Sequence, residues 1–391
     1  MSIAALFLLL QLQPAGDSIT LAGALAQARS GRAQATIAAA RVAEARASVR
    51  TAGTIANPGM SYTYSDAVPT SHLIFDQPFD WLLRRGSDRE TALAGVDRAI
   101  ADSASLLAAL GREVRVAFWR ARAGQLSRAL VEQQALQADS LARIAAARFR
   151  AGDISQFEQE QAAQEAARAH QAVSAARESE RVALSDLARA MGVETAPYPA
   201  GPLDAGLDQL PDSGIDVEGS PSVRAATADS AAAAAAAHSA AQARVPMPTL
   251  TGGAEWGDPA QPGTLALVGV SVPLPLWHHG SGPTEEARAR AAGAAAATGE
   301  VRLDAVRDVR EARIRLEETA SRARVARDSL VPAATRLRAQ ALRAYQAGET
   351  GIVPVLDAFR SERAVVLGGL QDELAFQEAV AQWVALAGRY E

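Results

Sequence analysis

A segment that occurs twice constrains the fold of this chain more than any other feature. The first copy is AARFRAGDISQFEQEQA at residues 146–162, and the second is ALRAYQAGETGIVPVLDA at residues 341–358. Gly152 corresponds to Gly348, and Asp153 corresponds to Glu349. The offset between the copies is half of the 391 residues. The chain is therefore predicted to contain two copies of one structural unit.

Each copy interrupts a long run of apolar residues at helical spacing. Apolar residues recur every three or four positions over residues 87–149 and again over 154–191. In the second half, Val309, Leu316 and Ala323 lie seven residues apart and belong to a longer heptad pattern. Glycine adopts the left-handed conformation that ends many helices. We therefore expect two long helical hairpins, at about 87–191 and about 285–388, with a kink at Pro332 in the second.

A pair of strands is predicted ahead of each hairpin. Residues at about 59–79 and about 249–274 alternate with the period of a strand and contain turn residues. Alanine-rich helical regions precede them, so each repeat contains a helix, two strands and a hairpin. The repeats occupy residues 17–196 and 220–391, and a linker rich in Pro, Gly and Asp joins them at 197–219. Four strands leave open edges, so self-association is expected. Three copies would supply twelve strands, a number that can close into a membrane barrel.

Composition excludes several classes of function. The chain has no Cys, so it has neither disulfides nor thiolate metal sites. A net charge of −5 provides no basic surface for nucleic acid. The sequence contains no catalytic triad and no phosphate-binding loop, and His278-His279 lacks a third ligand at regular spacing. We therefore expect no enzyme activity, no cofactor and no metal. Residues 1–16 contain an apolar run of about ten residues, which fits a signal peptide.

The two bends FRAGDISQFEQEQA and YQAGETGIVPVLDA carry a resemblance to a known family. Together with Pro78 and Pro273 near the strand ends, and SPSVRAA at the start of the second half, they resemble TolC-like outer-membrane efflux proteins over residues 17–391. This resemblance implies a mainly α protein with a small β part that forms a homotrimer. The trimer would form a 12-stranded β-barrel in outer-membrane lipid, continued by a 12-helix α-barrel in the periplasm. The two repeats of helix, strand, strand and long helical hairpin would build both parts.

The resemblance also implies a function and a set of site residues. The protein would be the outer-membrane channel of a tripartite efflux or type I secretion system, served by a periplasmic adaptor protein and an inner-membrane pump. Asp357 and Glu158 would line the pore constriction, although Asp357 also fits a solvated residue or a helix-dipole partner. The adaptor would dock at the bends, on Ala151, Gly152, Asp153, Ala347, Gly348 and Glu349. The acids beside the glycines differ from the family's usual Val-Gly-Leu or Val-Gly-Thr.

Four aromatic residues fit the girdle at the membrane interface of a barrel, and ordinary strand packing is the alternative. They are Trp81, Trp277, Tyr62 and Tyr64. Two other functions compete with the channel. A periplasmic adaptor would carry one hairpin between β-rich flanks, whereas this sequence predicts two hairpins. A structural coiled-coil protein of an envelope assembly would explain the heptads but not the paired strands.

Overall fold

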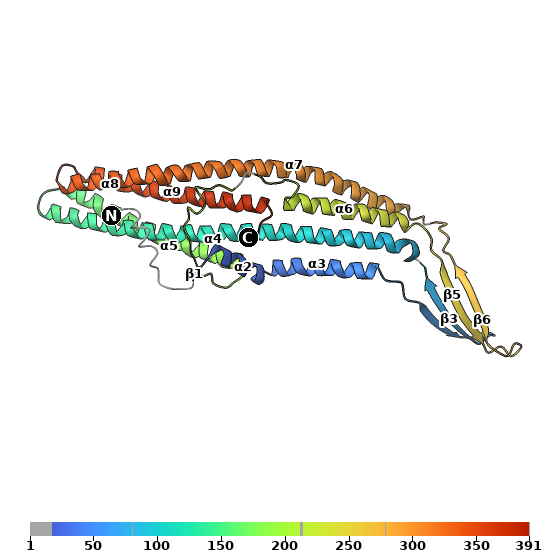
Figure 1. The fold of residues 1–391 in the computed structure, drawn as a ribbon. Helices are drawn as coiled ribbons and strands as arrows, with labels where there is room; N and C mark the ends of the chain where they lie inside the picture. Colours follow the sequence, from blue (N-terminus) through green and yellow to red (C-terminus); the bar gives the residue numbers. More distant parts are fainter. Residues whose placement is uncertain (1–17, 80, 212–213, 278, 391) are drawn as a thin grey trace. The chain divides into compact units, whose positions relative to one another are not determined.

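The computed structural model describes residues 18–79, 81–211, 214–277 and 279–390 (Figure 1). The predicted signal peptide at residues 1–16 lies outside them. The chain folds into two compact units. The first unit contains the described part of Met1–Thr36 together with Leu106–Ser220 and Val306–Glu391, and the second contains Ile37–Ser105 and Pro221–Ala305. Each unit therefore takes segments from both halves of the sequence.

The first unit is built from helical hairpins. Two helices, α4 and α7, contribute residues to both units. Helix α4 forms a hairpin with α5, and α8 forms a hairpin with α9 (Figure 1). The bounds are α2 Leu21–Gly31, α4 Trp81–Arg150, α5 Gln156–Met191, α7 Ser281–Val325, α8 Val331–Gln346 and α9 Ile352–Leu386. The hairpin predicted to start at about 87 therefore starts six residues earlier. Gly86 lies inside α4, because a single glycine weakens a helix by only about 1 kcal/mol.

Next to Pro332, where a kink is predicted, the helix contains a π-turn. Residues Ala326–Leu330 form this turn, and Pro332 lies in the first turn of α8. The amide of Val331 donates to the carbonyl of Ala326, one residue further back than in an α-helix. Proline has no amide hydrogen and its ring clashes with the carbonyl four residues earlier, so regular α-helical bonding cannot continue through it.

Alanine dominates the core of the first unit, so its helices pack closely. Alanines on α4 and α5 face each other in one cluster. The largest side chains with less than 2% exposure are Phe118, Tyr345 and Phe376, which lie in separate clusters. At Gly124 of α4, an added Cβ would lie only 3.3 Å from the Cα of Glu180 on α5. The small residues expected from composition therefore set the distance between these two helices.

The segment predicted as a linker at 197–219 is packed against the helices over much of its length. Strand β4, Tyr198–Pro199, pairs in parallel with β1, Ser18–Ile19. Leu203 and Leu207 are buried in two different clusters of the first unit. The Pro, Gly and Asp content, from which a linker is predicted, carries no information about this packing.

The second unit contains helices α3 (Ala33–Ala52, in part) and α6 (Pro221–Gln242) and a four-stranded antiparallel sheet. Its strands are β2 Gly59–Tyr64, β3 Ser71–Pro78, β5 Thr249–Trp256 and β6 Leu265–Ser271, in the order β2-β3-β5-β6. The strands from the two halves meet where β3 pairs with β5, with Ile74 opposite Gly253. A Cβ on Gly253 would lie 2.6 Å from the carbonyl oxygen of Leu73, so glycine permits this pairing. Among the described residues, no helix is long and apolar enough to cross a membrane.

The close approach at Gly124 gives a stability prediction. We expect Gly124→Leu to destabilise the fold by about 1–3 kcal/mol, because the new side chain overpacks the contact with α5. Gly95→Leu is the matched control on the same helix, since no atom lies within 4 Å of an added Cβ there. The control is expected to be neutral or slightly stabilising. Thermal midpoints measured at one scan rate test this, and equal effects of the two variants would contradict it.

Candidate functional site at the helix bends

The two bends, Ala151–Asp153 and Ala347–Glu349, have the same backbone geometry. Gly152 has φ +81° and Gly348 has φ +78°, both in the left-handed region. In the first bend the amide of Asp153 donates to the carbonyl of Arg148 at 2.9 Å, and the second bend repeats this bond at the same length. This six-to-one bond defines a Schellman motif, which satisfies the last carbonyls of a helix. The predicted glycine bends are therefore present in both copies.

All six residues predicted to dock an adaptor are exposed in the chain. They are Ala151, Gly152, Asp153, Ala347, Gly348 and Glu349. An added Cβ at either glycine would meet nothing within 4 Å. Both bends thus present open backbone and an acidic side chain to the surroundings, and their docking role stays a prediction.

The helices that leave the two bends begin differently. Helix α5 begins with a capping box, in which the amide of Glu158 donates to Oγ of Ser155 and the amide of Ser155 donates to the Glu158 carboxylate at 3.0 Å. In α9 the corresponding positions hold Gly351 and Pro354, and the N-cap makes no side-chain bond. The second return helix therefore lacks a cap of its own.

The carboxylate of Glu158 supplies the missing cap. It accepts a backbone hydrogen bond from Ile352, in the first turn of α9, and it lies 3.5 Å from where a Cβ on Gly351 would be. The bond from the Ser155 backbone, followed by contributions from Ile352 and the charge of Arg148, holds the pKa of Glu158 below its usual value. One carboxylate thus caps both return helices. The predicted role of Glu158 in a pore constriction stays a prediction beside this structural contact.

A buried tyrosine joins the two hairpins just below this cap. Tyr345 of α8 is 1% exposed and lies in a cluster with residues of α4, α5 and α9. The guanidinium of Arg148 lies 4.8 Å from the Tyr345 ring centroid, and its Nη1 donates to the Tyr345 carbonyl at 3.0 Å. The residue that corresponds to Tyr345 in the first copy is Phe149, which is exposed. The two repeats therefore differ at this position.

Asp357, the second predicted pore residue, is exposed on α9. Its carboxylate lies 3.5 Å from Nη1 of Arg360, and Nε of Arg360 lies 2.9 Å from the carboxylate of the buried Glu165. Arg363 also contacts Glu165, at 3.5 Å. Since the pair between Asp357 and Arg360 is exposed, water screens it and Asp357 keeps an accessible negative charge. Its position in a constriction stays a prediction.

Two exposed apolar residues flank the bends at matching positions. Phe157 is 66% exposed in the first turn of α5, and Val353 is 47% exposed in the first turn of α9. They occupy corresponding positions in the two copies of the repeated segment, but neither is among the predicted site residues. The matching apolar character in both copies was the signal available. Large exposed apolar side chains beside an open loop are typical of a protein-binding surface.

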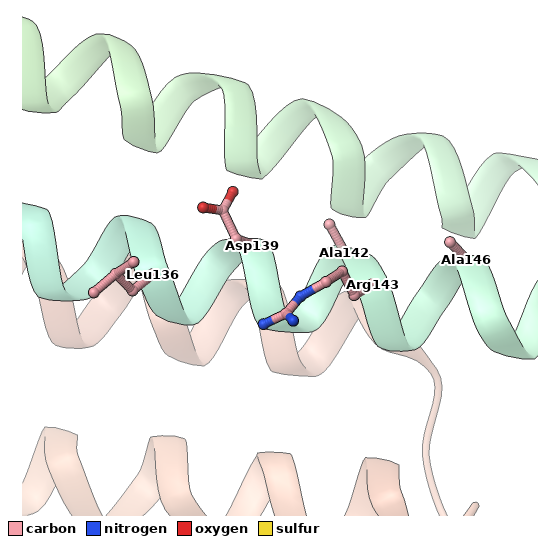
Figure 2. A pocket seen from close by; sticks show the side chains of 5 residues that line it. All are labelled: Leu136, Asp139, Ala142, Arg143 and Ala146. Atoms are coloured by element: carbon pink, nitrogen blue, oxygen red, sulfur yellow. The ribbon is translucent and has the colours of Figure 1, made fainter.

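A shallow groove of about 550 Å³ runs along α4 before the first bend. Its lining residues all come from that helix: Leu136, Asp139, Ala142, Arg143 and Ala146 (Figure 2). Asp139 is directed toward α5, where its carboxylate lies 3.0 Å from Nε2 of His170, while Arg143 extends away from α5 (Figure 2). The groove therefore has a charged residue on either side of a small apolar floor.

Three of the four aromatic residues predicted at a membrane interface are exposed. Trp277 is 91% exposed, and Tyr62 and Tyr64 extend from β2 as exposed side chains. Tyr62 stacks on Trp256, which sequence reasoning did not select, with 6.1 Å between ring centroids. Trp81 is partly buried against Phe79 at the start of α4. Their role at an interface stays a prediction.

Among the residues that the structure describes, no group of three His, Cys, Asp or Glu side chains could hold a metal ion. His278 lies outside those residues. The components of the candidate site at the bends are the backbone geometry, a shared cap, and exposed apolar and acidic groups.

Comparisons with known proteins find similarity in sequence family and in fold. A family model described as "Outer membrane efflux protein" matches residues 217–389. The fold is similar to that of the outer membrane protein VceC from Vibrio cholerae, with a TM-score of 0.78 and 17% identity over 95% of this chain and 97% of that one. It is also similar to the open state of the Neisseria gonorrhoeae MtrE outer membrane channel, with a TM-score of 0.77 and 19% identity over 94% and 89%. A third similar structure is the Campylobacter jejuni CmeC outer membrane channel, with a TM-score of 0.78 and 13% identity over 94% and 85%. No curated protein matches the chain significantly.

The shared cap generates a prediction. Glu158→Ala should cost about 1 kcal/mol at each helix start, because both α5 and α9 lose a capping acceptor. Amide exchange in the first turns of α5 and α9 should therefore accelerate about fivefold in the variant. Glu160→Ala, on the same helix and exposed, is the matched control. Unchanged exchange in α9 would contradict the shared cap.

The protection of the first turns of α5 and α9 against amide exchange should change with pH in a definite direction. The pKa of Glu158 is lowered from its usual 4.5, so the stabilising carboxylate is fully present above that value. Protection of both helix starts should persist at pH 4.5 and be lost only as the pH falls further.

Proposed function

We propose that this chain, whose residues 217–389 match the model of the outer membrane efflux protein family, is the outer-membrane channel of a tripartite efflux or type I secretion system. The observation that carries the proposal is the combination of two Schellman bends on long helical hairpins with a sheet whose outer strands are unpaired. Substrates would pass through it from an inner-membrane pump and a periplasmic adaptor to the exterior. A lone adaptor or a coiled-coil protein would not account for the channel fold.

The sheet supports a trimeric β-barrel in the outer membrane. The outer strands β2 and β6 run in opposite directions, so β6 of one copy can pair antiparallel with β2 of the next. Three copies would close twelve strands without a free edge. Exposed apolar residues on these strands, such as Val268 (81% exposed) and Met60, would face lipid. Lipid demands that every backbone group be satisfied, which closure of the sheet achieves.

Exposed apolar residues on the helices also support a trimer. Large apolar residues remain exposed along α7 and α8, including Leu303, Ile314 and Leu337. Leu136, at the groove on α4, is likewise left uncovered in one copy. Contact between neighbouring copies would bury these residues and continue the barrel as a twelve-helix periplasmic tunnel. The hydrophobic contribution is about 25 cal/mol for each Å² buried.

The bends support the partner assignment. Exposed Phe157 and Val353 beside two open glycine turns offer apolar anchors for the periplasmic adaptor, and Asp153 and Glu349 add negative charge. Asp357 follows the second bend on α9, and three copies of it around one axis would form an acidic ring. Such a ring attracts cations and repels anions.

The proposal predicts where the protein is found and in what assembly. Expressed in a bacterium with two membranes, the chain should fractionate with the outer membrane. In mild detergent it should elute as three copies of 40.7 kDa. Val268→Arg should reduce membrane insertion, because a charge on a lipid-facing strand is costly, by roughly 2–4 kcal/mol at mid-bilayer.

Ile55→Arg is the control for that variant, because Ile55 is an exposed apolar residue outside the strands. It should insert and assemble as the unmodified chain does. Recovery of the unmodified chain as a soluble monomer would overturn the proposal.

A further inference from the structure

The four-stranded sheet of the second unit has two faces of different chemistry. Residues opposite each other in antiparallel strands place their side chains on the same face, so the pairing register assigns every strand residue to a face. One of them, here named the apolar face, carries large exposed side chains: Met60, Tyr62, Phe75, Trp256, Val268 and Val270. Ser71 and Gln77 share it, and they are hydrogen-bonded to Tyr62 and to the carbonyl of Ala56. The apolar face therefore exposes few groups that need water.

The opposite face carries every acidic side chain and every histidine of the four strands. These residues, which define the polar face, are His72, Asp76 and Glu255. The described residues of the four strands include no Arg or Lys. Ile74, Leu265 and Leu267 also lie on this face. The charged groups are thus confined to the central strands β3 and β5.

Two polar pairs join the central strands on the polar face. Nδ1 of His72 lies 3.2 Å from Oε1 of Glu255, and the hydroxyl of Thr251 donates to the Asp76 carboxylate at 2.7 Å. The pairs are separated by about 13 Å along β3. The His72 pair lies next to the loops that join β2 to β3 and β5 to β6, whereas Asp76 lies near the end of β3 that leads into α4. Each end of the polar face therefore has its own carboxylate.

Of the two carboxylates, Asp76 is the one without a basic partner. A protonated His72 offsets the charge of Glu255, whereas Asp76 is bonded to a neutral hydroxyl. The residues that flank the Asp76–Thr251 pair on the outer strands are Gly59 and Gly269. Since glycine has no side chain, the outer strands leave room on both sides of this pair. Asp76 therefore presents a full negative charge on the polar face.

We propose that the polar face lines the pore of the assembled barrel and that Asp76 is a charge-selecting residue there, in addition to Asp357. This inference deepens the proposed function and rests on it, because a barrel with an inside forms only when copies assemble. Three copies place three Asp76 carboxylates around one axis, at the end of the barrel next to the helices. Rings of carboxylates attract cations and repel anions.

The opposite assignment of the two faces is unfavourable. It would turn His72, Asp76 and Glu255 toward lipid and the aromatic side chains toward water. Charged groups on a lipid-facing strand are costly, whereas apolar side chains form the outer band of a barrel and aromatic ones its interfacial girdles. The chemistry of the two faces thus decides which of them meets the pore.

Cysteine labelling tests the assignment of the faces. The chain contains no Cys, so a single-cysteine variant has one reactive thiol. Ser61 and Met60 are neighbours on β2, and they lie on the polar and the apolar face respectively. A positively charged, membrane-impermeant methanethiosulfonate should react with Ser61→Cys and reduce the current through the protein in a planar bilayer. The current of Met60→Cys should be unchanged.

Labelling is followed by mass spectrometry on the same samples. If Ser61→Cys fails to react, or if its current is unchanged after it has reacted, the polar face does not line the pore and the inference is overturned.

Reversal potentials under a salt gradient test the role of Asp76, because they give the ratio of cation to anion permeability. In Asp76→Asn this ratio should fall roughly threefold, since the three lost charges act on ions over distances comparable with the screening length. Asparagine keeps the size of the side chain and an acceptor for Thr251, so the variant should fold and assemble. Asp66→Asn is the matched control, because Asp66 is exposed in the loop between β2 and β3. Its permeability ratio should change less.

The outcomes separate this inference from the proposed function. A permeability ratio that is unchanged in Asp76→Asn, or that falls equally in Asp66→Asn, would overturn the role of Asp76 while the channel itself stands. Absence of current in the unmodified trimer would instead overturn the proposed function, and this inference with it.

Discussion

The left-handed glycine at each bend is the constraint on which the rest of this structure depends. A residue with a Cβ pays about 1–2 kcal/mol in that conformation, whereas Gly152 and Gly348 adopt it without this cost. The six-to-one bond across each glycine then closes the last turn of one helix, and the next helix starts within a few residues. Antiparallel packing of α4 with α5 and of α8 with α9 follows from these two reversals. Alanine on the facing surfaces allows that packing to be close.

The two copies share the bend but have diverged in how the following helix is capped. The first has Ser155 and Glu158 in a capping box, whereas the second has Gly351 and Pro354, which offer no side-chain acceptor. Glu158 serves both helix starts, so the second hairpin depends on the first. The buried Tyr345 with Arg148 across its ring adds a second connection. Movement of one bend relative to the other within a chain therefore requires that these contacts break.

Local pattern was sufficient for much of the fold. The glycine bends follow from the repeated motif. The four strands of the sheet follow from side chains that alternate with a period of two, and the long helices follow from apolar residues that recur every three or four positions. The segment at 197–219 was predicted only as a linker, because backbone carbonyls that accept bonds from distant Arg122, Arg324 and Gln377 leave no pattern in the sequence. The capping box at Ser155 has the S-x-x-E signature, so a signal for Glu158 was present. Its second contact, with Ile352, depends on tertiary proximity and could not be read from the sequence.

If the assembled chains form a conducting channel with Asp357 near its narrow end, current will flow across a planar lipid bilayer that contains the purified protein. We expect discrete conductance steps with a preference for cations, and a smaller preference in Asp357→Asn, because three carboxylates near one axis attract cations. A trimer that inserts but carries no current would contradict the proposed channel, and a cation preference unchanged in Asp357→Asn would contradict the place given to that residue.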